Sequence, residues 1–214
     1  MRSVSPQRHR TRREFLRLCG WTALAGSLAP GVCAAVAARR TEDADLGFLA
    51  GQLALKQRRT WTDVAARPWR LHEAGGFDRI TIHHAGNGVV RETAENAVVF
   101  RLQNMQTAHL RRNYGDIGYH FIIDYAGRTW EGRSLAYEGA HVSHHNRRNV
   151  GIMVIGNFEK QRPSDAQIKS CEVLVGLLRE HYRIKKNRVY GHRDLGHSIC
   201  PGRHLYARLA DLKR

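Results

Sequence analysis

The segment Val150-Gly151-Ile152-Met153-Val154-Ile155 is nearly all apolar. Such a composition is typical of a central strand that is buried on both faces, whereas a strand with one face in water alternates apolar and polar residues. The segment therefore predicts the centre of a sheet that other elements cover on both sides.

Strand and helix patterns alternate on both sides of this segment. Runs rich in β-branched and aromatic side chains predict strands over residues 79–84, 119–124, 128–131 and 188–192. Helical spacing predicts helices over 93–110 and 204–212, and a capping box of Ser164 and Gln167 starts a third helix that runs to about Tyr182. We expect an α/β fold: a single domain with a central mixed β-sheet flanked by helices.

The first 38 residues predict a secretory signal peptide of the twin-arginine type. Arg12-Arg13 precedes a moderately apolar stretch that ends in Ala34-Ala35-Val36-Ala37-Ala38. A retained membrane anchor is the alternative, but the stretch is short and is interrupted by Gly and Pro, so we expect no stable anchor. The signal peptide would direct export, and cleavage after Ala35, Ala37 or Ala38 would release the protein into the periplasm or the extracellular space.

Residues 39–69 are charged and lack a clear periodicity over much of their length, which we interpret as a linker or N-terminal arm with a short helix within 46–56. The folded domain is then expected over residues 70–214. We expect the chain to be a monomer.

The net charge of +16 favours acidic partners. Eight Arg and one Glu in the first 40 residues contribute +7 of this charge, which leaves +9 on residues 41–214. Nucleic acid is one candidate partner, but the sequence has no zinc finger, RNA-binding motif or base-reading basic helix, so we expect no nucleic acid. An acidic cell-wall polymer fits export better, and simple solubility is the remaining interpretation of the charge.

His83 and His192 each follow a predicted strand, and Cys200 stands in the loop after His192. Two imidazoles and a thiolate are good zinc ligands, and three protein ligands leave the fourth position open, as in catalytic zinc sites. His84 is the alternative to His83 as the first ligand. Adjacent strand residues face opposite sides of a sheet, so only one of the two histidines can point into the site. The pattern predicts a zinc hydrolase.

A disulfide between Cys171 and Cys200 would exclude this metal site, because it would consume the thiolate. Cys171 shares a helical stripe with Ile168, Val175 and Leu178, which predicts a small buried core residue. We therefore favour the metal.

Six motifs then occur in a fixed order. They are Ile82-His83-His84, Asp116-Ile117-Gly118-Tyr119-His120-Phe121-Ile122-Ile123, Trp130-Glu131-Gly132-Arg133, Gly139-Ala140-His141, Asn149-Val150-Gly151-Ile152 and Gly191-His192-Arg193-Asp194 with Cys200-Pro201-Gly202. In these motifs, over roughly residues 70–212, the sequence resembles the N-acetylmuramoyl-L-alanine amidase type 2 family, which includes peptidoglycan recognition proteins and phage T7 lysozyme.

The resemblance implies the fold of that family and one Zn²⁺ per chain, bound by His83, His192 and Cys200. It also implies a zinc metallo-amidase that hydrolyses the amide between N-acetylmuramic acid and L-alanine, with peptidoglycan or muropeptides as partners. A non-catalytic peptidoglycan-binding module is the alternative, although such members typically have lost a zinc ligand and this sequence keeps all three.

The resemblance also assigns roles around the metal. Tyr119 corresponds to the family's catalytic tyrosine, with core packing as the alternative interpretation. Ser198 stands at the family's second catalytic position, where threonine or lysine is usual, and the adjacent His197 is an alternative for that role. For substrate binding, the resemblance points to His141 and Asn146, and Arg133 is a further candidate that would face an acidic stem peptide.

Overall fold

The computed structural model describes residues 46–47, 49 and 52–213. The predicted signal peptide over residues 1–38 lies outside the described residues. Among the described residues, no helix combines the length and apolar character that a membrane crossing requires.

A six-stranded mixed sheet forms the centre of the domain, with strand order β1-β4-β3-β5-β2-β6. Its strands are β1 (Leu55–Lys56), β2 (Arg79–His84), β3 (Phe121–Ile123), β4 (Thr129–Glu131), β5 (Asn149–Val154) and β6 (Val189–Gly191). β5 lies between β3 and β2, runs parallel to both, and is buried over its whole length. The predicted central strand is therefore confirmed, and the predicted strands over 119–124 and 128–131 pair as an antiparallel hairpin of β3 and β4.

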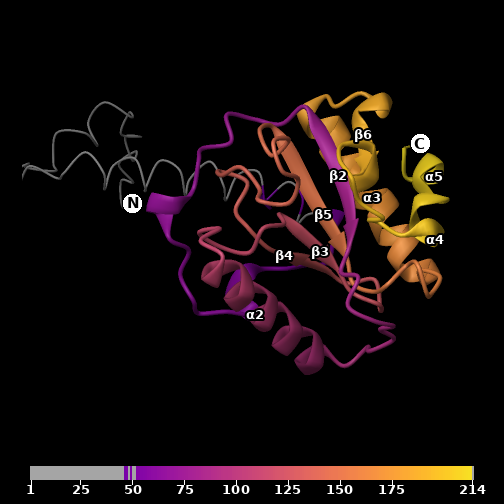
Figure 1. Ribbon diagram of the computed structural model, residues 1–214, viewed down its shortest axis with the longest axis horizontal. Helices are drawn as coiled ribbons and strands as arrows, with labels where there is room; N and C mark the ends of the chain where they lie inside the picture. Colours follow the sequence, from indigo (N-terminus) through magenta and orange to yellow (C-terminus); the bar gives the residue numbers. More distant parts are fainter. Residues whose placement is uncertain (1–45, 48, 50–51, 214) are drawn as a thin grey trace, which may run out of the picture. The chain divides into compact units, whose positions relative to one another are not determined.

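Two helices cover opposite faces of this sheet (Figure 1). Helix α2 (Glu95–Arg111) packs Val98 and Leu102 into a cluster with the sheet residue Met153. Helix α3 (Asp165–Tyr182) packs Leu174 and its neighbours against Ile152, which points to the other face. The alternation of successive side chains along β5 thus supplies both cores, as expected of a strand buried on both sides.

Local sequence signals explain how α3 begins and what it buries. Ser164 accepts a hydrogen bond from the backbone N–H of Gln167, whose side chain accepts one from the N–H of Ser164, so the predicted capping box is present. Cys171 is fully buried on the sheet-facing side, as predicted. The expected closing helix is instead two short helices, α4 (Arg203–Tyr206) and α5 (Leu209–Leu212).

The domain begins earlier in the sequence than predicted. β1 pairs in parallel with β4 inside the region interpreted as a linker, and it interrupts the helix expected within 46–56. Trp61 is 2% exposed and donates its indole N–H to the carbonyl of Glu131 at 2.7 Å. One large aromatic residue therefore anchors a charged segment that lacks an apolar periodicity of its own.

Candidate metal centre

The register of two parallel strands brings His83 and His192 together. Ile82 in β2 lies opposite Gly191 in β6, so the residues that follow them, His83 and His192, lie next to each other at the end of both strands. Their ring centroids are 4.7 Å apart. Two histidines more than a hundred residues apart in sequence thus meet at one sheet edge, as the strand-end pattern predicted.

Cys200 completes the group from the loop after β6. Its Sγ lies 3.6 Å from Nδ1 of His83, and the ligand atoms of His83, His192 and Cys200 all lie within 4.8 Å of one another. Both Cys171 and Cys200 are free thiols, so the competing disulfide is not formed. Two imidazole nitrogens and one sulfur are ligand types that zinc uses, and the three residues therefore fit a zinc ion.

Three hydrogen bonds to backbone groups hold the cysteine loop in place. The N–H of Cys200 donates to Oγ of Ser198 at 3.1 Å, and the carbonyl of Cys200 accepts from the N–H of Arg193 at 2.8 Å. The guanidinium of Arg193 also donates to the carbonyl of Ile199. Residues 193–200 are thereby tied to the short η5 helix (His192–Asp194), which carries the second histidine.

His84 points to the opposite face of β2. Its ring Nδ1 accepts a hydrogen bond from the backbone N–H of Phe158 at 3.2 Å, and the backbone N–H of His84 donates to Sγ of Cys200 at 3.3 Å. The alternation of strand side chains therefore settles the competition between the two adjacent histidines in favour of His83.

Burial sets the protonation of the three candidate ligands. It lowers the pKa of His83 well below the ordinary range, helped by the nearby His141 and His192, and it also lowers the pKa of His192. Neutral imidazole is the form that binds a metal. Burial raises the pKa of the Cys200 thiol to about 12, while a bound dication would favour the thiolate.

Tyr119 lies beside this group, with its ring centroid 5.2 Å from that of His83. Burial, together with the nearby Cys200, raises the pKa of Tyr119 above its ordinary value, so its hydroxyl stays protonated and is a hydrogen-bond donor. The residue also lines a cleft, so it is more than a core aromatic.

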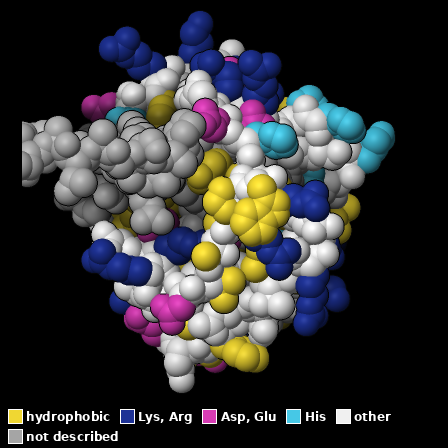
Figure 2. Space-filling view, turned by 90° about the vertical axis from the view of Figure 1, so that its left-hand side faces the viewer, with side chains coloured by type: hydrophobic (Ala, Val, Ile, Leu, Met, Phe, Trp, Pro, Cys, Tyr) yellow, Lys and Arg dark blue, Asp and Glu magenta, His cyan; other side chains and the backbone are white. Residues whose placement is uncertain are grey.

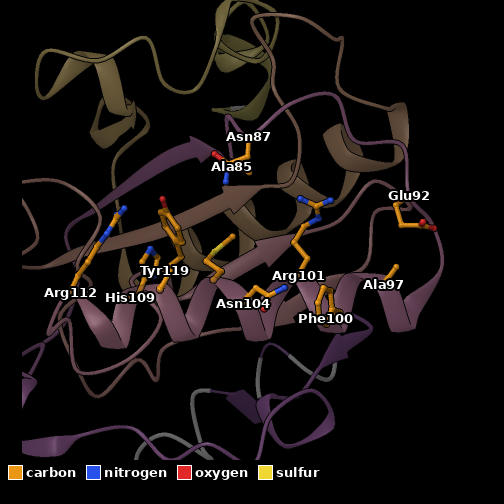
Figure 3. A pocket seen from close by; sticks show the side chains of 12 residues that line it. Ala85, Asn87, Glu92, Ala97, Phe100, Arg101, Asn104, His109, Arg112 and Tyr119 are labelled. Atoms are coloured by element: carbon orange, nitrogen blue, oxygen red, sulfur yellow. The ribbon is translucent and has the colours of Figure 1, made fainter.

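A cleft of about 610 Å³ runs from Tyr119 along α2 (Figure 3). The residues that line it are Ala85, Asn87, Glu92, Ala97, Phe100, Arg101, Asn104, Met105, Ala108, His109, Arg112 and Tyr119. Arg101, Asn104, Ala108 and Arg112 recur every three or four residues, which puts them on one stripe of the helix. These positions are not among the predicted site residues, although Arg101, Asn104 and Arg112 form a polar stripe beside the apolar stripe of α2 that was a usable signal.

Comparisons with known proteins identify the family of the chain. Residues 73–203 match the family model described as N-acetylmuramoyl-L-alanine amidase. The chain belongs to this amidase family. A human N-acetylmuramoyl-L-alanine amidase is 32% identical over 183 residues, which are 81% of this chain and 30% of the human protein, so the chain spans less than a third of that relative. Peptidoglycan-recognition protein SD of Drosophila simulans is 32% identical over 129 residues, which are 60% of this chain and 68% of that protein.

Solved structures share the fold. Drosophila PGRP-LB superposes with a TM-score of 0.66 at 26% identity, over 73% of this chain and 92% of that chain. A mutant of the same protein in complex with tracheal cytotoxin gives 0.65 at 26% identity, over 74% of this chain and 95% of that chain. The amidase LysC of Clostridium intestinale gives 0.58 at 25% identity, over 70% and 89%.

Within this amidase-family domain, Arg133 is a buried structural residue, and the prediction that it faces a stem peptide is wrong. Its side chain is 3% exposed, and its guanidinium donates to the backbone carbonyls of Ile117, Glu138, Tyr114 and Asp116 at 2.8, 2.7, 2.6 and 3.2 Å. The side chain thus joins the segment before β3 to the loop after β4, and its donors are used inside the protein.

Asn146 and His141 both make hydrogen bonds within the protein. Oδ1 of Asn146 accepts hydrogen bonds from the backbone N–H groups of His141 and Val142, both at 2.8 Å, and so shapes their loop. His141 is 9% exposed, lies behind His83, and has its pKa lowered to about 3, chiefly by burial and by the nearby His120. The expected groove contact of His141 is therefore wrong, because its ring turns inward, whereas Asn146 is half-buried and its contact with a substrate stays a prediction.

The assignment of Arg133 leads to a stability prediction. Arg133→Lys keeps the positive charge but removes the planar donor set, so buried carbonyls lose partners and the free energy of unfolding should fall by about 2–4 kcal/mol. Urea denaturation measures this, with exposed Arg91→Lys as the control, expected within about 0.5 kcal/mol of wild type. Full stability together with weaker muropeptide binding would restore the substrate role.

Proposed function

We propose that the protein is a zinc-dependent amidase that hydrolyses the amide between N-acetylmuramic acid and L-alanine of peptidoglycan. The observation that carries this proposal is the convergence of His83, His192 and Cys200 beside Tyr119, a residue that lines the cleft. A binding module has no need for a complete ligand set. Zinc, when bound, would lower the pKa of a water molecule and polarise the amide carbonyl.

The protein's own residues would then stabilise charge and position the substrate. Tyr119 would donate its protonated hydroxyl to the carbonyl oxygen as negative charge develops there. Oγ of Ser198 accepts from the N–H of Cys200, which leaves the hydroxyl hydrogen for a second donor role. His197 beside it is exposed and is the alternative for that role.

The cleft along α2 replaces the inward-facing Arg133 and His141 as the proposed substrate groove. Arg101 and Arg112 on its wall would attract the carboxylates of a stem peptide, and Asn104 would bind its backbone. Lys and Arg side chains also lie at several places on the face drawn in Figure 2. An excess of positive charge suits an acidic wall polymer.

Substitution of the candidate cysteine ligand distinguishes an amidase from a non-catalytic binding module. Cys200→Ser should abolish muropeptide cleavage and weaken zinc binding, while Cys171→Ala, a change at the other buried cysteine of the described residues, should keep one zinc per chain and cleavage. Zinc content and mass spectrometry of the products measure both effects. Tight muropeptide binding without cleavage by zinc-loaded wild type would support the recognition module instead.

Removal of the Tyr119 hydroxyl tests its role at the oxyanion. Tyr119→Phe should lower the cleavage rate by about 10²-fold or more with zinc content unchanged. Tyr114→Phe is the matched control, because that ring also packs on His109, and it should keep the wild-type rate. An unchanged rate in Tyr119→Phe would reduce this tyrosine to a packing residue.

We also propose export through the leader, which would bring the amidase to its wall substrate. Paired Arg12→Lys and Arg13→Lys should leave the precursor inside a bacterial host, whereas Arg39→Lys with Arg40→Lys, beyond the expected cleavage sites, should not. N-terminal sequencing of the exported protein should place cleavage after Ala35, Ala37 or Ala38. Export of both variants at the same level would contradict the twin-arginine route.

A further inference from the structure

A chain of hydrogen bonds leads from the centre of the sheet to the candidate metal ligand His83. The backbone carbonyl of Asn149 in β5 lies 3.1 Å from Nε2 of His141. The other ring nitrogen of His141, Nδ1, lies 3.0 Å from Nε2 of His83. Nδ1 of His83 in turn faces Sγ of Cys200 at 3.6 Å.

The carbonyl at the start of this chain fixes the position of every proton along it. A carbonyl oxygen only accepts, so Nε2 of His141 must carry the hydrogen. Neutral imidazole has one N–H, and Nδ1 of His141 is therefore an acceptor. That acceptor requires the hydrogen of His83 on Nε2. Nδ1 of His83 is then left with its lone pair directed toward Cys200. The opposite arrangement would set a lone pair of His141 against the carbonyl of Asn149.

We infer that His141 is a positioning residue that holds His83 in the Nε2–H tautomer and so selects Nδ1 of His83 as the metal-binding atom. Partners of this kind fix the ring orientation and the tautomer of ligating histidines, and their loss typically weakens metal binding. The inference rests on the proposed zinc site for its consequence, but the tautomer itself is a property of the metal-free protein.

The surrounding backbone is built to hold the ring of His141. A Cβ atom on Gly139 would lie 2.3 Å from Cδ2 of His141, and one on Gly151 would lie 2.5 Å from the same atom. Two glycines on different segments therefore provide the space for the imidazole. His120 adds a third wall, with its ring centroid 6.0 Å from that of His141 and its Nδ1 accepting from the N–H of Gly151 at 3.0 Å.

A pair of substitutions with the same branched shape and the same number of side-chain heavy atoms separates positioning from simple packing. His141→Asn and His141→Leu both shorten the side chain and leave a similar space behind. Asn keeps an acceptor, Oδ1, near the place of Nδ1, whereas Leu has none. Both variants are made in the leaderless chain, that is, without the predicted signal peptide over residues 1–38. Circular dichroism and urea denaturation establish that each one folds.

Two measurements follow on the same proteins. Nitrogen-15 NMR of the metal-free chain reports which ring nitrogen of His83 carries the hydrogen, and competition with a chelator reports the affinity for zinc alone. Wild type and His141→Asn should show the Nε2–H form, and His141→Leu should lose this preference and bind zinc about 10–100-fold more weakly.

The results also separate this inference from the proposed function. A hydrogen on Nδ1 of His83 in wild type, or equal zinc affinity in wild type and His141→Leu, would overturn the role of His141. A wild-type chain that binds no zinc would contradict the proposed amidase, and the NMR spectra would still decide the tautomer. If neither variant folds, the wild-type spectrum alone decides between the two tautomers.

Discussion

The parallel register of β2 with β5 and β6 is the constraint on which the candidate centre depends. It places Ile82 opposite both Ile152 and Gly191, and it brings the residues at the end of β2 to the start of the loop that carries His192 and Cys200. A shift of one residue would turn every side chain of β2 to the other face. His83 would then point toward the α3 side, and Ile80 and Ile82 would leave the core that fixes the register.

Burial of the histidines is costly unless each ring nitrogen finds a partner. The sheet supplies these partners from its own backbone: the carbonyl of Asn149 faces His141, and the N–H of Gly151 donates to His120. The same burial keeps the imidazoles neutral, which suits metal binding, and keeps the Tyr119 hydroxyl protonated. One arrangement of β5 thus serves both the stability of the core and the chemistry proposed for the site.

Sequence reasoning succeeded where the signal is local or follows from strand geometry. The apolar run of β5, the Ser164 capping box and the alternation of His83 and His84 are of this kind. It failed for Arg133, because the carbonyls that surround its guanidinium come from residues 114–117 and 138, whose approach is set by tertiary packing. It failed for His141 for the same reason, since the space made by Gly139 and Gly151 cannot be read from either segment alone. The role of Trp61 was hidden by the charged residues around it.

Zinc X-ray absorption spectroscopy of the leaderless chain, loaded with one equivalent of zinc, tests the central claim most directly. A centre formed by His83, His192 and Cys200 predicts nitrogen ligands at about 2.0–2.1 Å and a single sulfur at about 2.3 Å, in a four-coordinate site. A spectrum without a sulfur ligand would contradict the account, because it would remove Cys200 from the metal and with it the centre on which the proposed amidase depends.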